Sequence, residues 1–237
     1  MKFKPFQPTL ALRPTQFSIG LLEVEYKVVA MRKLTPEKLA RLIAQTPIPV
    51  IVSPWGHLCL IDHHHYLFAC WHMDIPQVKV QIVENYLDSD LSYTRFWQAM
   101  AKKKHAYLRD QFGDGPRSPV YLPLDVRGMA DDPYRSLAWM VRKEGGYENS
   151  TQSFAEFAWA DYFRGHKLLN RRGREGFHAA VRRGLVLARS PAARKLPGYT
   201  GHKTSAIEAE QGERALLLKS KYVPKARAKG ELASLPQ

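Results

Sequence analysis

The segment Asp62–His65 consists of one carboxylate and three consecutive imidazoles. It ends the second of two apolar runs, Pro49–Ser53 and Leu58–Asp62, which flank a Pro-Trp-Gly turn. This pattern predicts a β-hairpin whose second strand ends at four titratable groups. The apolar spacing that follows predicts a helix over residues 64–73. Because the first N–H groups of a helix attract anions, we expect phosphate chemistry at this corner.

The residue types at the corner suit phosphoryl transfer, which needs positive charge and often a base beside the nucleophile. His63, His64 and His65 can each accept a proton or carry positive charge near neutral pH. Asp62 can orient an imidazole or hold Mg²⁺. The alternative interpretation is that Asp62 caps the helix and that one of the histidines is only packed.

A metal site is a separate hypothesis for the same residues. One carboxylate and three imidazoles form a nitrogen and oxygen ligand set for Mg²⁺ or another divalent metal, with Asp62 as the first candidate ligand. His57 on the hairpin and His72 on the helix are candidate partners. No second cluster of His and Cys residues has clear ligand spacing.

The elements around the corner predict an α/β (α+β) fold with a small mixed sheet. Residues 23–30 alternate and predict a strand. Thr35-Pro36-Glu37 is a helix-start signal, with Thr35 as N-cap and Pro36 in the first turn. Residues 77–83 alternate again. The predicted order is β-α-β-β-α-β, with helices packed on the sheet.

The rest of the chain is predicted to be helical. Helices are expected over residues 91–111, 134–143, 153–164 and 174–189, and the final 30 or so residues are expected to be poorly ordered. We therefore expect a core over residues 1–85, a helical extension packed on it over 86–190, and a basic, flexible tail over 191–237.

Composition narrows the class of protein. The 237 residues contain 45% hydrophobic residues, which indicates a globular chain. No apolar run reaches the roughly 20 residues of a membrane helix, and the N-terminus has no secretory signal. Only two cysteines are present, so a disulfide framework is not expected. These features predict a cytoplasmic protein without membrane contact, and they leave its oligomeric state open.

Positive charge is concentrated in the last third of the chain. From Arg164 onward there are 17 Lys and Arg residues against 5 Asp and Glu residues. Basic segments release counterions on meeting a polyanion, so DNA is a natural partner, although a solvated tail would look the same. The candidate nucleic-acid contacts are Arg171, Arg172, Arg174, Arg182 and Arg183.

With these motifs in place, the chain resembles the ParB/sulfiredoxin superfamily and, more closely, the bacterial group of ParB-like nucleases. The likeness runs from about Thr9 to Arg164. The segments that carry it, besides the corner, are Leu12–Gln16, Ile19–Gly20, Glu23, Lys27, Ile48–Val50, Asp132–Ala138 and Phe154–Asp161.

The resemblance implies a phosphate-binding corner. In ParB proteins the matching corner binds nucleotide phosphates, and free-serine kinases of the superfamily carry Asp-Gly-His-His-Arg there, matched by Asp62, His64 and His65. His63 replaces the glycine and Tyr66 replaces the arginine, which removes a bidentate phosphate contact. The corner has no cysteine, so the sulfiredoxin reaction is not implied.

Further phosphate contacts are expected from outside the corner. The resemblance brings Arg13, Gln16 and Lys27 beside it. Arg135 and Ser136 lie just inside a predicted helix start, where N–H groups and a guanidinium can hold an anion, although an ion pair of Arg135 with Asp131 or Asp132 is the alternative.

The sequence therefore predicts a nuclease or a nucleotide-dependent phosphotransferase that acts at the Asp62–His65 corner on DNA or a nucleotide. The competing hypothesis is a non-catalytic DNA-binding or chromosome-partition accessory protein in which the corner only binds phosphate.

Overall fold

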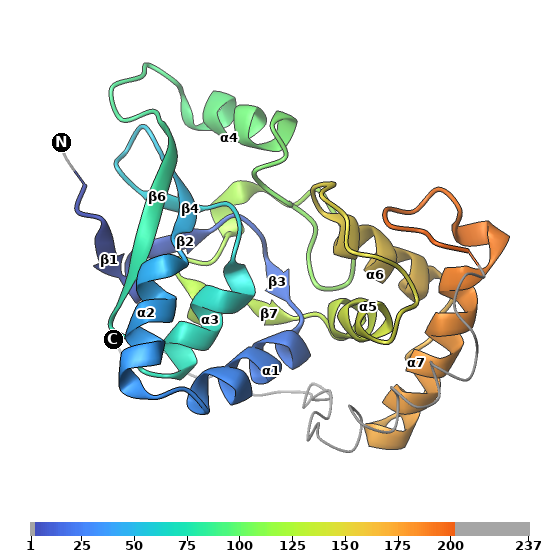
Figure 1. The fold of residues 1–237 in the computed structure, drawn as a ribbon. Coiled ribbons are helices and arrows are strands. Elements are labelled where there is room, and N and C mark those ends of the chain that lie inside the picture. The colour runs from blue at the N-terminus through green and yellow to red at the C-terminus, as the bar shows by residue number, and fades with distance from the viewer. Residues whose placement is uncertain (1–2, 202–237) are drawn as a thin grey trace, which may run out of the picture.

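A computed structural model describes residues 3–201 and shows a curled five-stranded mixed sheet with helices around it (Figure 1). The strand order is β1-β6-β4-β5-β2. The strands are β1 (Phe6–Pro8), β2 (Leu12–Pro14), β4 (Ile48–Val52), β5 (Leu58–Leu60) and β6 (Gln77–Asn85). β4 and β5 form the predicted hairpin, and β2 runs parallel to β5 at the edge of the sheet.

Both faces of the hairpin are buried, because alternate residues point to opposite sides of a strand. Val50, Val52, Leu58 and Leu60 join the main core with α1 (Leu21–Arg32) and α3 (His64–His72). Ile51 and Cys59 face the other way, onto α4 (Tyr93–Lys102). The sheet, α1, α3 and α2 (Pro36–Gln45) together form the first layer. The N-cap of α2, Thr35, accepts from the Lys38 N–H as the sequence predicts. The mixed α/β class is confirmed.

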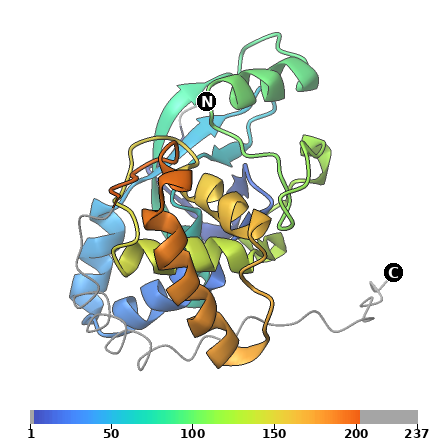
Figure 2. The same cartoon turned by 90° about the vertical axis from the view of Figure 1, so that its right-hand side faces the viewer.

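The helical extension builds a second core. It contains α5 (Pro133–Lys143), α6 (Ala155–Gly165) and α7 (Gly173–Arg189), which lie to one side of the sheet in Figure 1 and in front of it in Figure 2. Their buried apolar residues pack on one another and on Leu22 of α1. A short parallel pair, β3 (Ser18–Ile19) with β7 (Ala130–Asp131), joins the first layer to α5.

The predicted strand over residues 23–30 is wrong, since this segment lies in α1. Val24, Val28 and Met31 are buried at helical spacing, so the apparent alternation was incidental. The N-cap of α1 is Gly20, which has no side chain. Its first N–H groups are satisfied from distant parts of the chain instead: Leu21 donates to Asp131 Oδ1 and Leu22 donates to Ser136 Oγ. No local pattern reveals such capping.

The predicted helix over residues 91–111 is shorter than expected. It ends at Lys102, and Lys104 adopts a left-handed backbone with a φ of 58°. The chain then leaves the helix because Tyr107 pairs with the N-terminal segment, donating its N–H to the Thr15 carbonyl over 3.0 Å. The other three helices of the extension lie within two residues of their predicted bounds.

The first residues of the predicted tail pack against the second core. Residues 191–201 belong to the described structure, and Ala193 is fully buried. The prediction of disorder over the last 30 or so residues lies outside the described residues. The proposed domain boundaries stay a prediction.

Within residues 3–201, no helix is both long and apolar enough to span a membrane.

Candidate functional site

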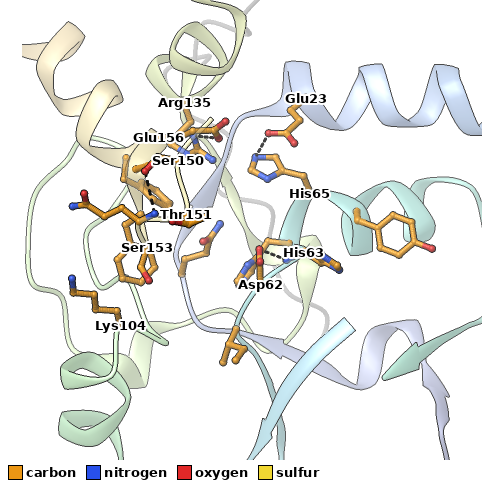
Figure 3. A pocket seen from close by; sticks show the side chains of 18 of the residues that line it. Glu23, Asp62, His63, His65, Lys104, Arg135, Ser150, Thr151, Ser153 and Glu156 are labelled. Carbon is orange, nitrogen blue, oxygen red and sulfur yellow. Dashed lines mark hydrogen bonds and ion pairs between the residues drawn. The ribbon is translucent and has the colours of Figure 1, made fainter. Parts of the chain in front are cut away.

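The Asp62–His65 corner lies on one wall of a cleft between the sheet layer and the extension. The cleft has a volume of about 580 Å³. Figure 3 shows Asp62 and His63 on one side, with Ser150, Thr151 and Ser153 facing them across the opening. The wall with the corner comes from the β5–α3 connection and α1, and the opposite wall comes from α5, α6 and the loops before them.

His63 stands at the N-terminus of α3 in a left-handed conformation. Its φ is 65°, in the left-handed region that glycine adopts most easily. No side chain of the described residues caps this helix start, so its first N–H groups are available to a ligand. The half-buried His63 ring lines the cleft, and its Nδ1 is buried without a hydrogen-bond partner among residues 3–201. Asp62 is exposed, and its Oδ1 accepts from the His63 N–H over 2.6 Å.

His64 and His65 are tied to the backbone of the N-terminal segment. Nε2 of His64 accepts from the Thr15 N–H at 3.3 Å, and Nε2 of His65 accepts from the Gly20 N–H at 3.1 Å. Burial lowers the pKa of His64 well below 6.5, and the neighbouring imidazoles and Arg135 lower it further. Burial also lowers the pKa of His65, although Glu23 opposes the change. Both rings are therefore neutral acceptors that hold the corner in place.

Of the three contacts implied by the resemblance, two line the cleft. Lys27 does so with its Nζ 3.3 Å from Glu23 Oε1, and Glu23 Oε2 lies 3.6 Å from His65 Nε2. Gln16 also lines the cleft, and its amide donates to the Ser18 carbonyl. Arg13 does not line it. Its neighbour across the β2–β5 pair is Cys59, on the α4 side of the sheet, because alternation turns this position away from the corner.

Arg135 lines the cleft, and it forms an ion pair with a residue that the sequence did not suggest. It pairs with Glu156 at 2.6 Å rather than with Asp131 or Asp132, and Arg142 holds the other carboxylate oxygen at 2.7 Å. Burial favours the neutral form of Glu156, but the two guanidinium groups outweigh it and hold its pKa at about 2. Nε of Arg135 is buried with no partner found in the described chain.

Ser136 is not a cleft residue. Its side chain is fully buried, and its hydroxyl accepts from the Leu22 N–H at 3.2 Å. The sequence correctly placed it at a helix start, but the hydroxyl serves α1 instead of a ligand. Asp132 caps α5 by accepting from the Tyr134 N–H, and it pairs with Arg164 at 2.7 Å.

The sequence missed two parts of the cleft. Lys104 and His105 line it, although the basic run around them is typical of a solvated helix face. Five consecutive uncharged polar residues, Asn149–Ser153, line it as well. A run of Asn, Ser, Thr, Gln and Ser is typical of an ordinary loop. Neither segment has a local signal for a site, because only the fold brings them opposite the corner.

Three of the five candidate nucleic-acid arginines lie together, and the other two do not join them. Arg171, Arg172 and Arg182 line a second hollow of about 360 Å³ at the start of α7. Arg183 is structural, since it donates to the Leu168 carbonyl and to Asn170 Oδ1. Arg174 is exposed on the first turn of the helix and does not line the hollow.

The corner does not fit a protein-built metal centre. No group of three or more His, Cys, Asp or Glu side chains in the described part of the chain could hold a metal ion. Two of the three imidazoles already accept backbone N–H groups, and one Asp62 oxygen does the same. His57 and His72 do not line the cleft. We therefore derive no chemical step through a metal.

Comparison with known proteins identifies a similar structure and a family. A crystal structure of the protein Atu1540 from Agrobacterium tumefaciens is similar, with 32% sequence identity and a TM-score of 0.73. The match covers 84% of this chain and 96% of Atu1540. No curated protein matches the chain. The model of the family described as "Putative ParB-like nuclease" matches residues 8–165, which include both walls of the cleft. The chain belongs to this ParB-like nuclease family.

Proposed function

We propose that the cleft is the active site of a phosphate-ester hydrolase or phosphotransferase that acts on DNA or a nucleotide, with the phosphate at the N-terminus of α3. The family supports a ParB-like nuclease function in general terms. The observation that carries the finer proposal is His63, whose Nδ1 has no partner within residues 3–201 and whose ring lies beside an uncapped helix start.

In this proposal, N–H groups and cations bind the phosphate at the N-terminus of α3. The N-terminus of α3 supplies free N–H donors and the positive end of the helix dipole. Lys27 and Lys104 reach the cleft from two different walls, and Arg135 adds a buried guanidinium. Preorganised charge of this kind stabilises a transferring phosphoryl group.

His63 is the residue we assign to proton transfer. It takes the proton from an attacking hydroxyl, either of water or of an acceptor alcohol, and it returns a proton to the leaving oxygen. His64 and His65 are positioning residues, since each has its Nε2 occupied by a backbone N–H. Asp62 fixes the His63 backbone through its 2.6 Å contact.

The test is a turnover assay of the purified full chain with bis(4-nitrophenyl) phosphate, linear DNA and the four nucleoside triphosphates, each with Mg²⁺ and with a chelator. His63→Asn is the informative variant because asparagine tolerates a left-handed φ and cannot relay a proton. We expect its turnover rate to fall by about 10²-fold or more. His72→Ala is the matched control, an exposed histidine on the same helix that does not line the cleft. Equal rates in the wild type and His63→Asn would exclude this role of His63.

A second candidate function is non-catalytic binding of DNA. It is favoured by the three arginines around the hollow at the start of α7, which suit contact with phosphates of a nucleic-acid backbone. DNA binding by the wild-type chain with no turnover of any phosphate ester in the same assay would select this function over the first.

A further inference from the structure

One part of the far wall of the cleft is the segment Asn149–Ser153, in which all five side chains are uncharged and can form hydrogen bonds. Ser150, Thr151 and Ser153 line the cleft opposite Asp62 and His63 (Figure 3), and the Ser150 hydroxyl accepts from the Gln152 N–H over 3.1 Å. The wall with the corner offers N–H groups and Lys27, and the far wall carries the cations Arg135 and Lys104. The segment Asn149–Ser153 differs from both groups, because it offers hydroxyl and amide groups that match hydroxyls and heterocyclic amides.

Both ends of this segment are fixed. On the N-terminal side, Tyr147 stacks on the fully buried Trp159 with ring centroids 4.1 Å apart, and its hydroxyl donates to the Ala138 carbonyl. On the C-terminal side, Phe154 adopts a left-handed backbone and starts α6. Contacts that fix Tyr147 and its neighbour Glu148 therefore also fix the position of the segment Asn149–Ser153.

The hydrogen bonds that fix this end of the segment come from residues 197 and 198, which lie beyond the part of the chain that the family model matches. The Glu148 N–H donates to the Gly198 carbonyl over 2.8 Å, and the Trp159 indole N–H donates to the Pro197 carbonyl over 2.7 Å. Gly198 has a φ of 73°, and a Cβ there would lie 2.1 Å from the Glu148 carbonyl oxygen. Only glycine permits this close approach of the two backbones.

We propose that Asn149–Ser153 is the specificity wall of the cleft, that it contacts the nucleoside part of a phosphate ligand, and that Gly198 is its positioning residue. This inference rests on the proposed function, since the phosphate is taken to lie at the corner. A cleft of about 580 Å³ is in the range of small-ligand sites and has room for one nucleoside monophosphate.

The experiment is calorimetric titration of the full chain with inorganic phosphate and, separately, with AMP, GMP, CMP and UMP. The variants are Gly198→Ala, which moves the wall, and the double variant Asn149→Ala/Gln152→Ala, which removes two exposed amides from it. The matched control is Gly201→Ala. It has a similar φ of 67°, but its added Cβ would meet nothing closer than 3.6 Å.

We expect the wild type to bind at least one nucleoside monophosphate about tenfold more tightly than phosphate, as one or two well-made hydrogen bonds provide. Gly198→Ala and the double variant lose most of this margin, and their affinity for inorganic phosphate stays within about twofold of the wild type. Gly201→Ala keeps both affinities.

The outcomes separate the two proposals. If the wild-type chain binds no phosphate ligand, the proposed function fails. If phosphate binds but no nucleotide binds more tightly, or if the double variant keeps the full margin, the specificity wall is wrong. If the double variant loses the margin while a folded Gly198→Ala keeps it, the role of Gly198 is wrong. The double variant leaves the backbone contacts intact, so it decides the role of the wall even when Gly198→Ala does not fold.

Discussion

Thr15 and His64 are 49 residues apart in the chain, and the backbone N–H of Thr15 donates to Nε2 of His64 over 3.3 Å. The Thr15 hydroxyl also donates to the Leu60 carbonyl, so the N-terminal segment is attached to both sides of the Asp62–His65 corner. His64 is almost wholly buried in this contact. Its ring thus works as a structural acceptor, which separates it from His63 although the two are adjacent in sequence.

Replacing His64 should mainly affect stability. In His64→Ala the Thr15 N–H loses its buried acceptor and a cavity remains, so we expect the free energy of unfolding to fall by about 2 kcal/mol. The measurement is urea denaturation followed by tryptophan fluorescence. His63→Asn should remain within about 0.5 kcal/mol of the wild type, because its side chain is only half-buried. A His64→Ala protein as stable as the wild type would show that the contact contributes little.

Stability should fall as the pH drops below about 6.5. Burial holds the pKa of His64 and of His65 below their ordinary value of 6.5, so the unfolded chain takes up protons that the folded chain does not. Their contribution is complete above pH 6.5 and decreases as the pH falls toward the folded-state pKa, by up to about 1.4 kcal/mol per pH unit for each group. Urea denaturation at pH 7.5 and pH 5.5 measures the effect. His64→Gln keeps an acceptor and does not titrate, so its pH dependence should be smaller; an unchanged dependence would assign it to other groups.

Glu156 should be required for the integrity of the extension. Glu156→Gln leaves Arg135 buried without its anionic partner, which we expect to cost about 3 kcal/mol at pH 7. Since the pKa of Glu156 is held at about 2, its stabilising contribution is present above pH 4.5 and is lost as the pH falls toward 2. Thermal unfolding across this pH range gives the test. Asp114→Asn removes an exposed pair with Arg117 and is the control that should change little.

Phosphate ligands should protect the chain against thermal unfolding, because they bind the folded state. Lys27→Ala should weaken the protection, since Lys27 lines the cleft. Arg13→Ala should leave it unchanged, because the structure places Arg13 outside the cleft. The shift in melting temperature with inorganic phosphate and with ATP measures both. The opposite ranking of the two variants would show that the ligand binds elsewhere.

DNA affinity should depend on some of the C-terminal arginines and not on others. The double variant Arg171→Ala/Arg172→Ala should weaken DNA binding and make log affinity fall less steeply with log salt, by about 0.9 for each DNA phosphate that is no longer neutralised. Substitution is a better test than truncation after Arg164, because α7 buries Phe177, Val181 and Leu185 in the second core. Lys38→Ala/Arg41→Ala on exposed positions of α2 removes the same charge and should keep the wild-type slope.

Local sequence signals were enough to predict the elements that depend on interactions between nearby residues. The hairpin at β4 and β5, the helix that follows it, and the starts of α2 and α5 were predictable because a Pro-Trp-Gly turn, a Thr-Pro cap and an Asp-Asp-Pro cap act over a few residues. The corner was predictable for the same reason. Its four titratable residues are consecutive, so no tertiary contact is needed to bring them together.

What each of these residues does depends on contacts between distant parts of the chain. The segment of α1 was predicted as a strand from an incidental alternation. No local cap marks its start as a helix, because the N–H groups of Leu21 and Leu22 donate to Asp131 and Ser136, more than 100 residues away. The three adjacent histidines differ in role because Thr15 and Gly20 lie within hydrogen-bond distance of His64 and His65 and occupy those two rings, whereas the His63 ring faces the cleft. Lys104 and Asn149–Ser153 line the cleft because loops far apart in the chain pack against one another, and burial and hydrogen-bond partners of this kind follow from the whole fold rather than from local spacing.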